Sequence, residues 1–98
     1  MTENYKNIEI DLLLYSKEAV INAMYKFTNI FFVKSEPISD AKISVTFTAK
    51  DNSIVTEETI NEFFNELIDQ QIRINVEKEY KTIREEIVKK AFNPINEH

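Results

Sequence analysis

The chain has 98 residues, of which 43% are hydrophobic, and it carries a net charge of −5 from 12 basic and 17 acidic side chains. This length and composition indicate one globular domain with a core, and they exclude a disordered chain. The acidic surplus disfavours nucleic acid and anionic membranes as partners, because both carry negative charge themselves.

The residue types that are missing from the chain narrow its chemistry. There is no cysteine, which excludes disulfides, zinc–thiolate sites, iron–sulfur clusters and cysteine nucleophiles. There is no glycine, which excludes glycine-rich phosphate loops and dinucleotide fingerprints. The single histidine is the last residue, His98, so no imidazole remains for a catalytic triad or a metal cage. We therefore expect no enzyme activity, no cofactor and no metal.

No segment has the composition of a targeting or membrane sequence. The first residues combine a short apolar run with acidic residues inside it, which is atypical of a signal peptide. No run of about 18 apolar residues occurs. We expect a cytoplasmic protein with a single domain over residues 1–98, whose ends fray over residues 1–6 and 94–98.

The first half of the sequence predicts a strand, a helix and two further strands. Hydrophobic and polar residues alternate over residues 8–14, which is typical of a strand with one buried face. Ser16 is suited to cap a helix that runs to about Thr28. A β-prone run at residues 30–33 and an alternating run at residues 43–48 predict the next two strands.

The second half of the sequence is helical in its spacing. From Thr56 onwards the apolar residues face one side of a helix as far as Ile74. Later apolar residues lie almost opposite that side if the helix continues straight: Tyr80, Ile83, Ile87 and Ala91. The segment Thr82–Glu85 also matches a capping box. We therefore predict two helices with a break between Glu77 and Thr82. The alternative is one continuous helix that buries opposite faces on two partners.

These elements predict an α+β fold in the order β-α-β-β-α-α. A right-handed crossover makes the first two strands parallel, and the third strand can lie between them, antiparallel to both. The result is a three-stranded sheet with helices packed on one face.

Two adjacent aromatic residues, Phe31 and Phe32, are the first candidate for a binding site. Adjacent residues of a strand point to opposite faces, so one of the two enters the core and the other needs a different covering. That covering is a helix, a second subunit in a homodimer, or a bound peptide. If this strand is a sheet edge, its backbone can also accept an added strand.

The helical stretch over residues 63–73 contains the second candidate. Gln71 falls within the apolar stripe, so we predict that it is mostly buried and bonded to a backbone group, or that it lies under a ligand groove. Four other polar residues point away from the core and are either solvated or contact another protein: Glu66, Asp69, Gln70 and Arg73. Asp69 and Arg73 are spaced for an ion pair along the helix.

Two stretches of the sequence resemble the HxsD family of the His-Xaa-Ser system. Residues 63–92, FFNELIDQQIRINVEKEYKTIREEIVKKAF, resemble the C-terminal half of that family, with Asn65–Arg73 as the most specific run. Residues 15–33, YSKEAVINAMYKFTNIFFV, resemble its first helix and the following strand. Together the two stretches cover well over half of the chain.

The resemblance implies a setting for the protein. HxsD-like proteins accompany two radical SAM enzymes and a precursor peptide with His-Xaa-Ser repeats, in what resembles a peptide-modification system. The radical chemistry would belong to those enzymes, because their clusters need cysteines that this chain lacks. The implied role is that of a non-catalytic accessory protein that binds the precursor peptide or a partner enzyme. The alternatives are a self-associating structural protein and a small enzyme that works through carboxylates.

Overall fold

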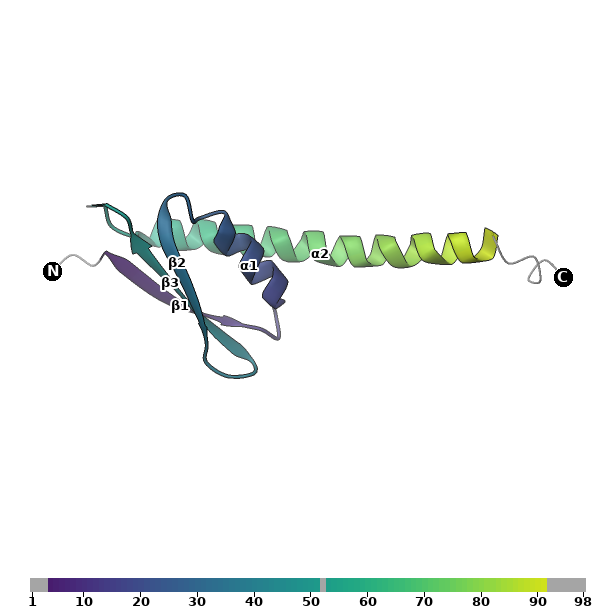
Figure 1. Cartoon of the computed structure of the whole chain (residues 1–98), viewed down its shortest axis with the longest axis horizontal. Helices are drawn as coiled ribbons and strands as arrows, with labels where there is room; N and C mark the ends of the chain where they lie inside the picture. Colours follow the sequence, from purple (N-terminus) through teal and green to yellow (C-terminus); the bar gives the residue numbers. More distant parts are fainter. Residues whose placement is uncertain (1–3, 52, 92–98) are drawn as a thin grey trace.

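The computed structural model describes residues 4–51 and 53–91. These form three strands and two helices in the order β-α-β-β-α (Figure 1): β1 Tyr5–Asp11, α1 Lys17–Tyr25, β2 Phe31–Pro37, β3 Lys42–Ala49 and α2 Glu57–Ala91. The α+β class and the first five elements agree with the prediction from sequence. The predicted sixth element is not separate, because it is part of α2.

The three strands form one antiparallel sheet in the order β1-β3-β2. The central strand β3 is antiparallel to both neighbours, so β1 and β2 run parallel to each other at the two edges, as predicted. The register places Thr48 of β3 opposite Tyr5 of β1 on one side and opposite Phe32 of β2 on the other. Tyr5 and Phe32 therefore occupy equivalent positions on the two edges of the sheet.

The core lies between one face of the sheet and the two helices. It contains buried residues from all five elements and from the segment before α2: Ile10, Ala19, Val20, Ala23, Phe31, Val45, Phe47, Ala49, Val55, Ile60, Phe63, Leu67 and Ile74. The other face of the sheet is polar. There the Asn7 side-chain amide donates hydrogen bonds to Ser44 Oγ at 2.6 Å and to Thr46 Oγ1 at 2.7 Å. The alternation of apolar and polar residues along β3 thus separates a packed face from a solvated one.

Aromatic rings form the centre of this core. Phe47 of β3 and Phe63 of α2 are fully buried, and their ring centroids are 5.0 Å apart in an edge-to-face arrangement. Phe27 packs against both rings at 5.9 Å and 5.6 Å. These contacts join the sheet, the segment after α1 and the first half of α2, and edge-to-face ring pairs add to the area that they bury.

The first strand ends earlier than the alternating pattern predicted. β1 stops at Asp11, whose side-chain oxygen accepts a hydrogen bond from the Leu13 amide at 2.8 Å. The Asp11 carbonyl accepts two more, from the amides of Leu14 and Tyr15. This turn places Leu14 in solvent with 70% of its surface exposed, although the pattern put it on the buried face. A local aspartate turn therefore overrides the alternation.

The cap of α1 is the one that the sequence predicted. The Ser16 hydroxyl accepts a hydrogen bond from the Ala19 amide at 3.2 Å, and α1 begins at Lys17. The helix ends at Tyr25, three residues before the predicted end at Thr28. Thr28 instead donates its hydroxyl to the Tyr25 carbonyl at 2.7 Å, in the turn that leads to β2.

The predicted break between Glu77 and Thr82 is wrong, because α2 is continuous from Glu57 to Ala91. The Thr82 hydroxyl donates to the Lys78 carbonyl of the preceding turn at 3.0 Å, so it does not act as a cap. Nothing in the sequence forces a break either, since residues 57–91 include no glycine and no proline. The alternative interpretation, one long helix, describes the structure.

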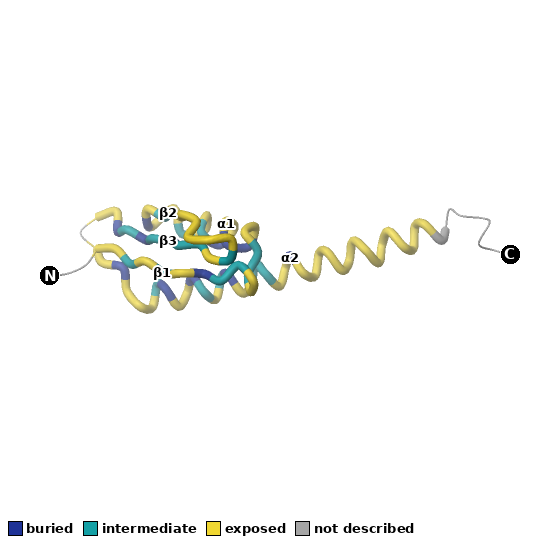
Figure 2. Tube along the Cα trace, turned by 90° about the horizontal axis from the view of Figure 1, so that it is seen from below, coloured by how far each residue is buried: buried dark blue, intermediate teal, exposed yellow. Residues whose placement is uncertain are grey.

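The second half of α2 projects away from the rest of the molecule (Figures 1 and 2). Buried and half-buried residues lie in the sheet, in α1, in the connecting segments and in the part of α2 up to Ile74, whereas residues 75–89 are all exposed. At 1.5 Å per residue the 35-residue helix is about 50 Å long. It makes the molecule elongated, with a longest dimension of 75 Å.

Two expectations concern the ends of the chain and its relation to membranes. β1 begins at Tyr5, so Tyr5 and Lys6 are paired with β3 although the frayed end was expected to extend through residue 6. Residues 1–3 and 94–98 lie outside the described residues. Within the described ranges, no helix combines the length and the hydrophobicity that a membrane crossing requires.

Candidate functional site

The structure offers surfaces rather than an enclosed site. Over residues 4–51 and 53–91, no group of three or more His, Asp or Glu side chains is placed to hold a metal ion. In the same part of the chain no polar or charged residue is buried. Perturbed, buried titratable groups are the usual mark of a catalytic centre, and the candidate site therefore has to be sought on the exposed faces.

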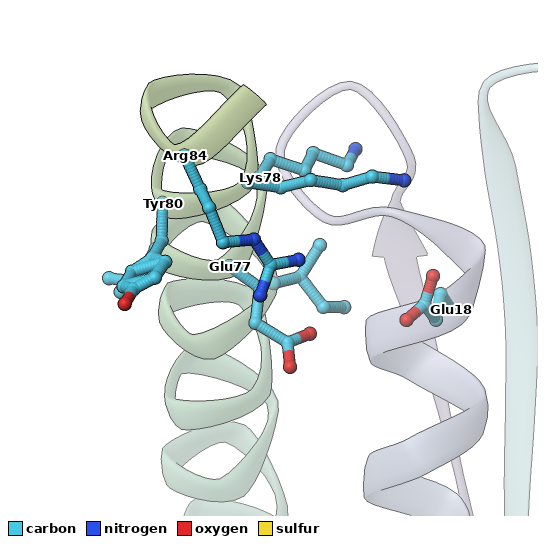
Figure 3. Close-up of a pocket in the computed structure, with 8 residues that line it drawn as sticks. Glu18, Glu77, Lys78, Tyr80 and Arg84 are labelled. Atoms are coloured by element: carbon cyan, nitrogen blue, oxygen red, sulfur yellow. The ribbon is translucent and has the colours of Figure 1, made fainter. Parts of the chain in front are cut away.

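A hollow of about 640 Å³ lies where α2 leaves the body, beside the first turn of α1 (Figure 3). It is lined mainly by long charged and apolar side chains: Glu18, Ile74, Val76, Glu77, Lys78, Tyr80, Lys81 and Arg84. All of these except Ile74 are exposed. Small-molecule pockets usually enclose their ligand, whereas this hollow is an open recess of the surface.

The Phe31–Phe32 pair of β2 divides between the two faces of the sheet, as its position on a strand predicted. Phe31 is 7% exposed and packs in the core, with its ring 6.3 Å from that of Phe47. Phe32 is 61% exposed on the other face, and within the described chain no helix covers it. Its neighbour there is Lys50, whose ammonium group lies 5.3 Å from the ring centroid and also donates to the Thr28 carbonyl at 2.8 Å.

β2 is an edge strand, so one side of its backbone has no strand partner among the described residues. Its outward charges pair along the strand itself, with Lys34 Nζ 3.3 Å from Glu36 Oε1. The other edge is different, because Lys6 Nζ of β1 lies 3.5 Å from Glu57 Oε2 in the first turn of α2. A helix thus flanks the β1 edge. The residues of β2 after Val33 are all exposed, whereas β1 alternates exposed residues with half-buried and buried ones.

The polar helix cluster, which comprises Glu66, Asp69, Gln70 and Arg73, is paired within the chain. Glu66 Oε2 accepts a hydrogen bond from the Gln70 amide at 2.8 Å and lies 3.2 Å from the ammonium group of Lys26. Lys26 is the C-terminal cap residue of α1. Glu66 was expected to point away from the core, but it is half-buried and joins the two helices.

Asp69 and Arg73 form the predicted ion pair along α2. Arg73 Nε donates to Asp69 Oδ2 at 2.8 Å. The hydrogen bond and the negative charge of Asp69 raise the pKa of Arg73 above its ordinary value. Because both side chains are substantially exposed, the pair contributes little to the free energy of folding.

Gln71 forms the backbone hydrogen bond that the sequence predicted. Its Oε1 accepts from the Ser16 amide at 2.7 Å, and its Nε2 donates to Asn75 Oδ1 at 3.0 Å. Gln71 is half-buried, which agrees with the prediction that most of the side chain is buried. It lies at the margin of the contact between α1 and α2, where one side of the amide still meets solvent. Its role is structural, since it binds the residue that caps α1.

The Gln71→Leu variant is expected to lower the free energy of unfolding by about 1–3 kcal/mol, because the Ser16 amide loses its acceptor. Urea unfolding measures this change. The Gln71→Glu variant is the matched control, since its carboxylate still accepts the bond at neutral pH and suits the N-terminus of α1. An Asn75→Ala variant should have little effect. Equal stability of Gln71→Leu and the wild type would show that the Ser16 bond contributes nothing.

The outer stripe of α2 is a second exposed apolar surface, and the alternative prediction of one long helix places three of its residues, Tyr80, Ile83 and Ile87, against a partner. It comprises five residues that are each 56–63% exposed: Ile72, Val76, Tyr80, Ile83 and Ile87. The change of phase after Ile74 is the signal of this stripe: it favoured the start of another helix, with one continuous helix as the alternative. In a continuous helix the same change means that the apolar face turns from the core towards solvent.

Comparison with known proteins identifies a family. The family model described as His-Xaa-Ser system protein HxsD matches residues 10–98. Neither the curated proteins nor the solved structures include a match to the chain. The matched range includes both stretches that carry the resemblance, together with all of β3 and the last two residues of β1, Ile10 and Asp11. Because it covers most of the 98 residues, the chain belongs to the HxsD family.

Proposed function

We propose that the protein is a non-catalytic accessory protein of the His-Xaa-Ser system, and that it binds the precursor peptide as an additional strand along β2. Family membership associates the chain with that system. The observation that carries the proposal is the accessible edge of β2, with the exposed Phe32 ring at its start. Strand addition gives affinity through backbone hydrogen bonds and needs no catalytic residue.

Three features support β2 over β1 as the edge that receives the peptide. The β1 edge is flanked by α2 through the Lys6–Glu57 contact. β2 presents a large ring at Phe32, whereas the equivalent ring at the β1 edge, Tyr5, is somewhat less exposed, at 50% against 61%. The Lys50 ammonium group lies 5.3 Å from the Phe32 ring centroid, so the outer face offers a ring and a positive charge to an incoming strand. A side chain of the peptide opposite Phe32 would lie within contact distance.

The test is a calorimetric titration with the full-length precursor peptide, comparing the wild type with two single variants. Phe32→Ser is expected to raise the Kd about threefold to fivefold, because an aromatic cross-strand pair contributes up to about 1 kcal/mol. Tyr5→Ser is the matched control. It removes an exposed ring from the position opposite the same Thr48, but on the β1 edge, and should leave the Kd unchanged.

A further variant tests whether the peptide binds at the polar helix cluster instead of at β2. Exchange of the two charges, in the double variant Asp69→Arg with Arg73→Asp, preserves the ion pair but reverses its polarity on the surface of α2. If this exchange weakens peptide binding and Phe32→Ser does not, the polar helix cluster is the binding surface and the strand model is wrong. If the folded wild type does not bind the precursor but binds a partner enzyme, the accessory role is retained and precursor binding is refuted.

A further inference from the structure

We propose that the outer stripe of α2 is the interface with a second copy of this chain, which pairs with it as a parallel coiled coil. This inference is independent of peptide binding, because it concerns another element and another face. Four of the five residues of the stripe, from Val76 to Ile87, lie on the half of α2 that projects beyond the body, where residues 75–89 are all exposed (Figure 2). Five large apolar side chains in solvent along one line of a helix are unusual in a monomer.

The spacing of the stripe is that of a coiled-coil seam. Val76, Tyr80, Ile83 and Ile87 follow one another at intervals of four, three and four residues. This is the heptad pattern in which Tyr80 and Ile87 occupy a positions and the other two occupy d positions. A surface helix that packs on a globular core has a broader apolar face, as the first half of α2 does.

The stripe is also accessible to a second copy. At about 100° per residue it lies roughly opposite Ile74 and Leu67, which face the core. Two copies that pair through the stripe therefore keep their bodies on the outer sides of the two helices, and the bodies do not obstruct the seam. Continuous α-helix through Ala91 supplies the length that the seam needs.

Charges beside the seam select a second copy in parallel orientation. Glu79 occupies the g position before Tyr80, and Arg84 occupies the e position after Ile83. In a parallel pair each g position lies beside the following e position of the partner helix, so each Glu79 lies beside Arg84 of the other copy. In an antiparallel pair centred between Tyr80 and Ile83, Glu79 would lie beside Glu86. The repulsion between these carboxylates would offset the attraction of Glu77 for Arg84 of the other copy. In the parallel dimer the attraction between Glu79 and Arg84 occurs twice, once on each side of the seam. The charges of one copy therefore complement those of the other.

The size of the interface sets the expected affinity. Two such stripes bury on the order of 1,000 Å² in total, which is near the lower limit for a specific interface. We therefore expect a dimer that forms at micromolar concentrations and dissociates on dilution. The monomer mass of 11.6 kDa makes this easy to follow by light scattering or sedimentation equilibrium.

The decisive test is a charge-exchange series on the full chain. In a parallel dimer, Glu79→Lys and Arg84→Glu each replace two attractive contacts by two repulsive ones, and each should raise the dimer Kd about tenfold. The double variant should restore the wild-type Kd, because the attraction returns with reversed polarity. Glu85→Lys and Lys81→Glu are the controls, since they change the net charge equally on the side of α2 away from the seam.

The other outcomes overturn the proposal. If Glu79→Lys tightens the dimer, the helices pair antiparallel, because the new lysine would then face Glu86. If Phe32→Ser abolishes the dimer while the charge variants do not, the copies meet through β2. A wild type that keeps the mass of one chain at all concentrations would exclude a second copy from the stripe.

Discussion

Replacing Phe63 by alanine is expected to lower the free energy of unfolding by about 3–5 kcal/mol. Phe63 is fully buried in α2, and its ring meets those of Phe27, Phe47 and Phe64 edge to face. Small domains have total stabilities of about 5–15 kcal/mol, so this one change removes a large share of the total. Urea unfolding followed by circular dichroism measures the difference.

Ile21→Ala is the control for this experiment. Ile21 lies on α1 and is 59% exposed, so its replacement should change the free energy of unfolding by no more than about 0.5 kcal/mol. If Phe63→Ala were as mild as Ile21→Ala, the aromatic cluster would not be the centre of the core, and the packing of α2 on the sheet would have to be revised.

Replacing Ile83 by proline is expected to remove helix from the second half of α2. A proline inside a helix costs about 3 kcal/mol, and residues 75–89 are all exposed, so burial in the core does not offset this cost. Far-ultraviolet circular dichroism should lose helical signal, while the urea midpoint of the body stays unchanged. The seam of the proposed dimer should be lost together with the helix.

This change separates the two interpretations of the sequence. If Thr82 capped a new helix, Ile83 would be its first residue, a position at which proline is well tolerated. The Ile83→Ala variant is the control, because it removes the apolar side chain and retains the helix. A proline variant with undiminished helical signal would contradict the continuous helix.

The strands and the core could be predicted because period-two alternation depends directly on which face is buried. The alternating run in β3 contains Ile43, Val45 and Phe47, and the run with helical spacing in α2 contains Ile60, Phe63 and Leu67. Each pattern predicts one buried face, and the structure confirms both predictions. β1 ended early because a side-chain turn at Asp11 competes with the strand, and alternation contains no information about that turn.

The continuity of α2 could not be predicted from one chain alone. A serine or threonine followed three residues later by glutamate caps a helix only if the backbone before it is not helical. Thr82 bonds back to Lys78 instead, an option that the same residue types permit. The apolar residues beyond Ile74 therefore have the pattern of a second core face. The pattern alone does not distinguish a face that is buried in this chain from a face that contacts another molecule.

The candidate surfaces were predictable in part. The division of Phe31 and Phe32 between two faces follows from strand geometry, and so does the role of β2 as an edge in a three-stranded sheet. The internal pairing of Glu66 with Lys26 was not predictable, because it depends on how α1 crosses α2. That pairing reduces the charge that the polar helix cluster presents to a partner.

Hydrogen exchange of the backbone amides, measured with and without the full-length precursor peptide, tests the central claim most directly. Strand addition pairs the outer side of β2 with the peptide, so the amides over residues 32–36 should exchange more slowly in the complex, while those over residues 6–10 of β1 should not change. Slower exchange that is confined to residues 66–73 of α2, or to β1, with β2 unchanged, would contradict the account.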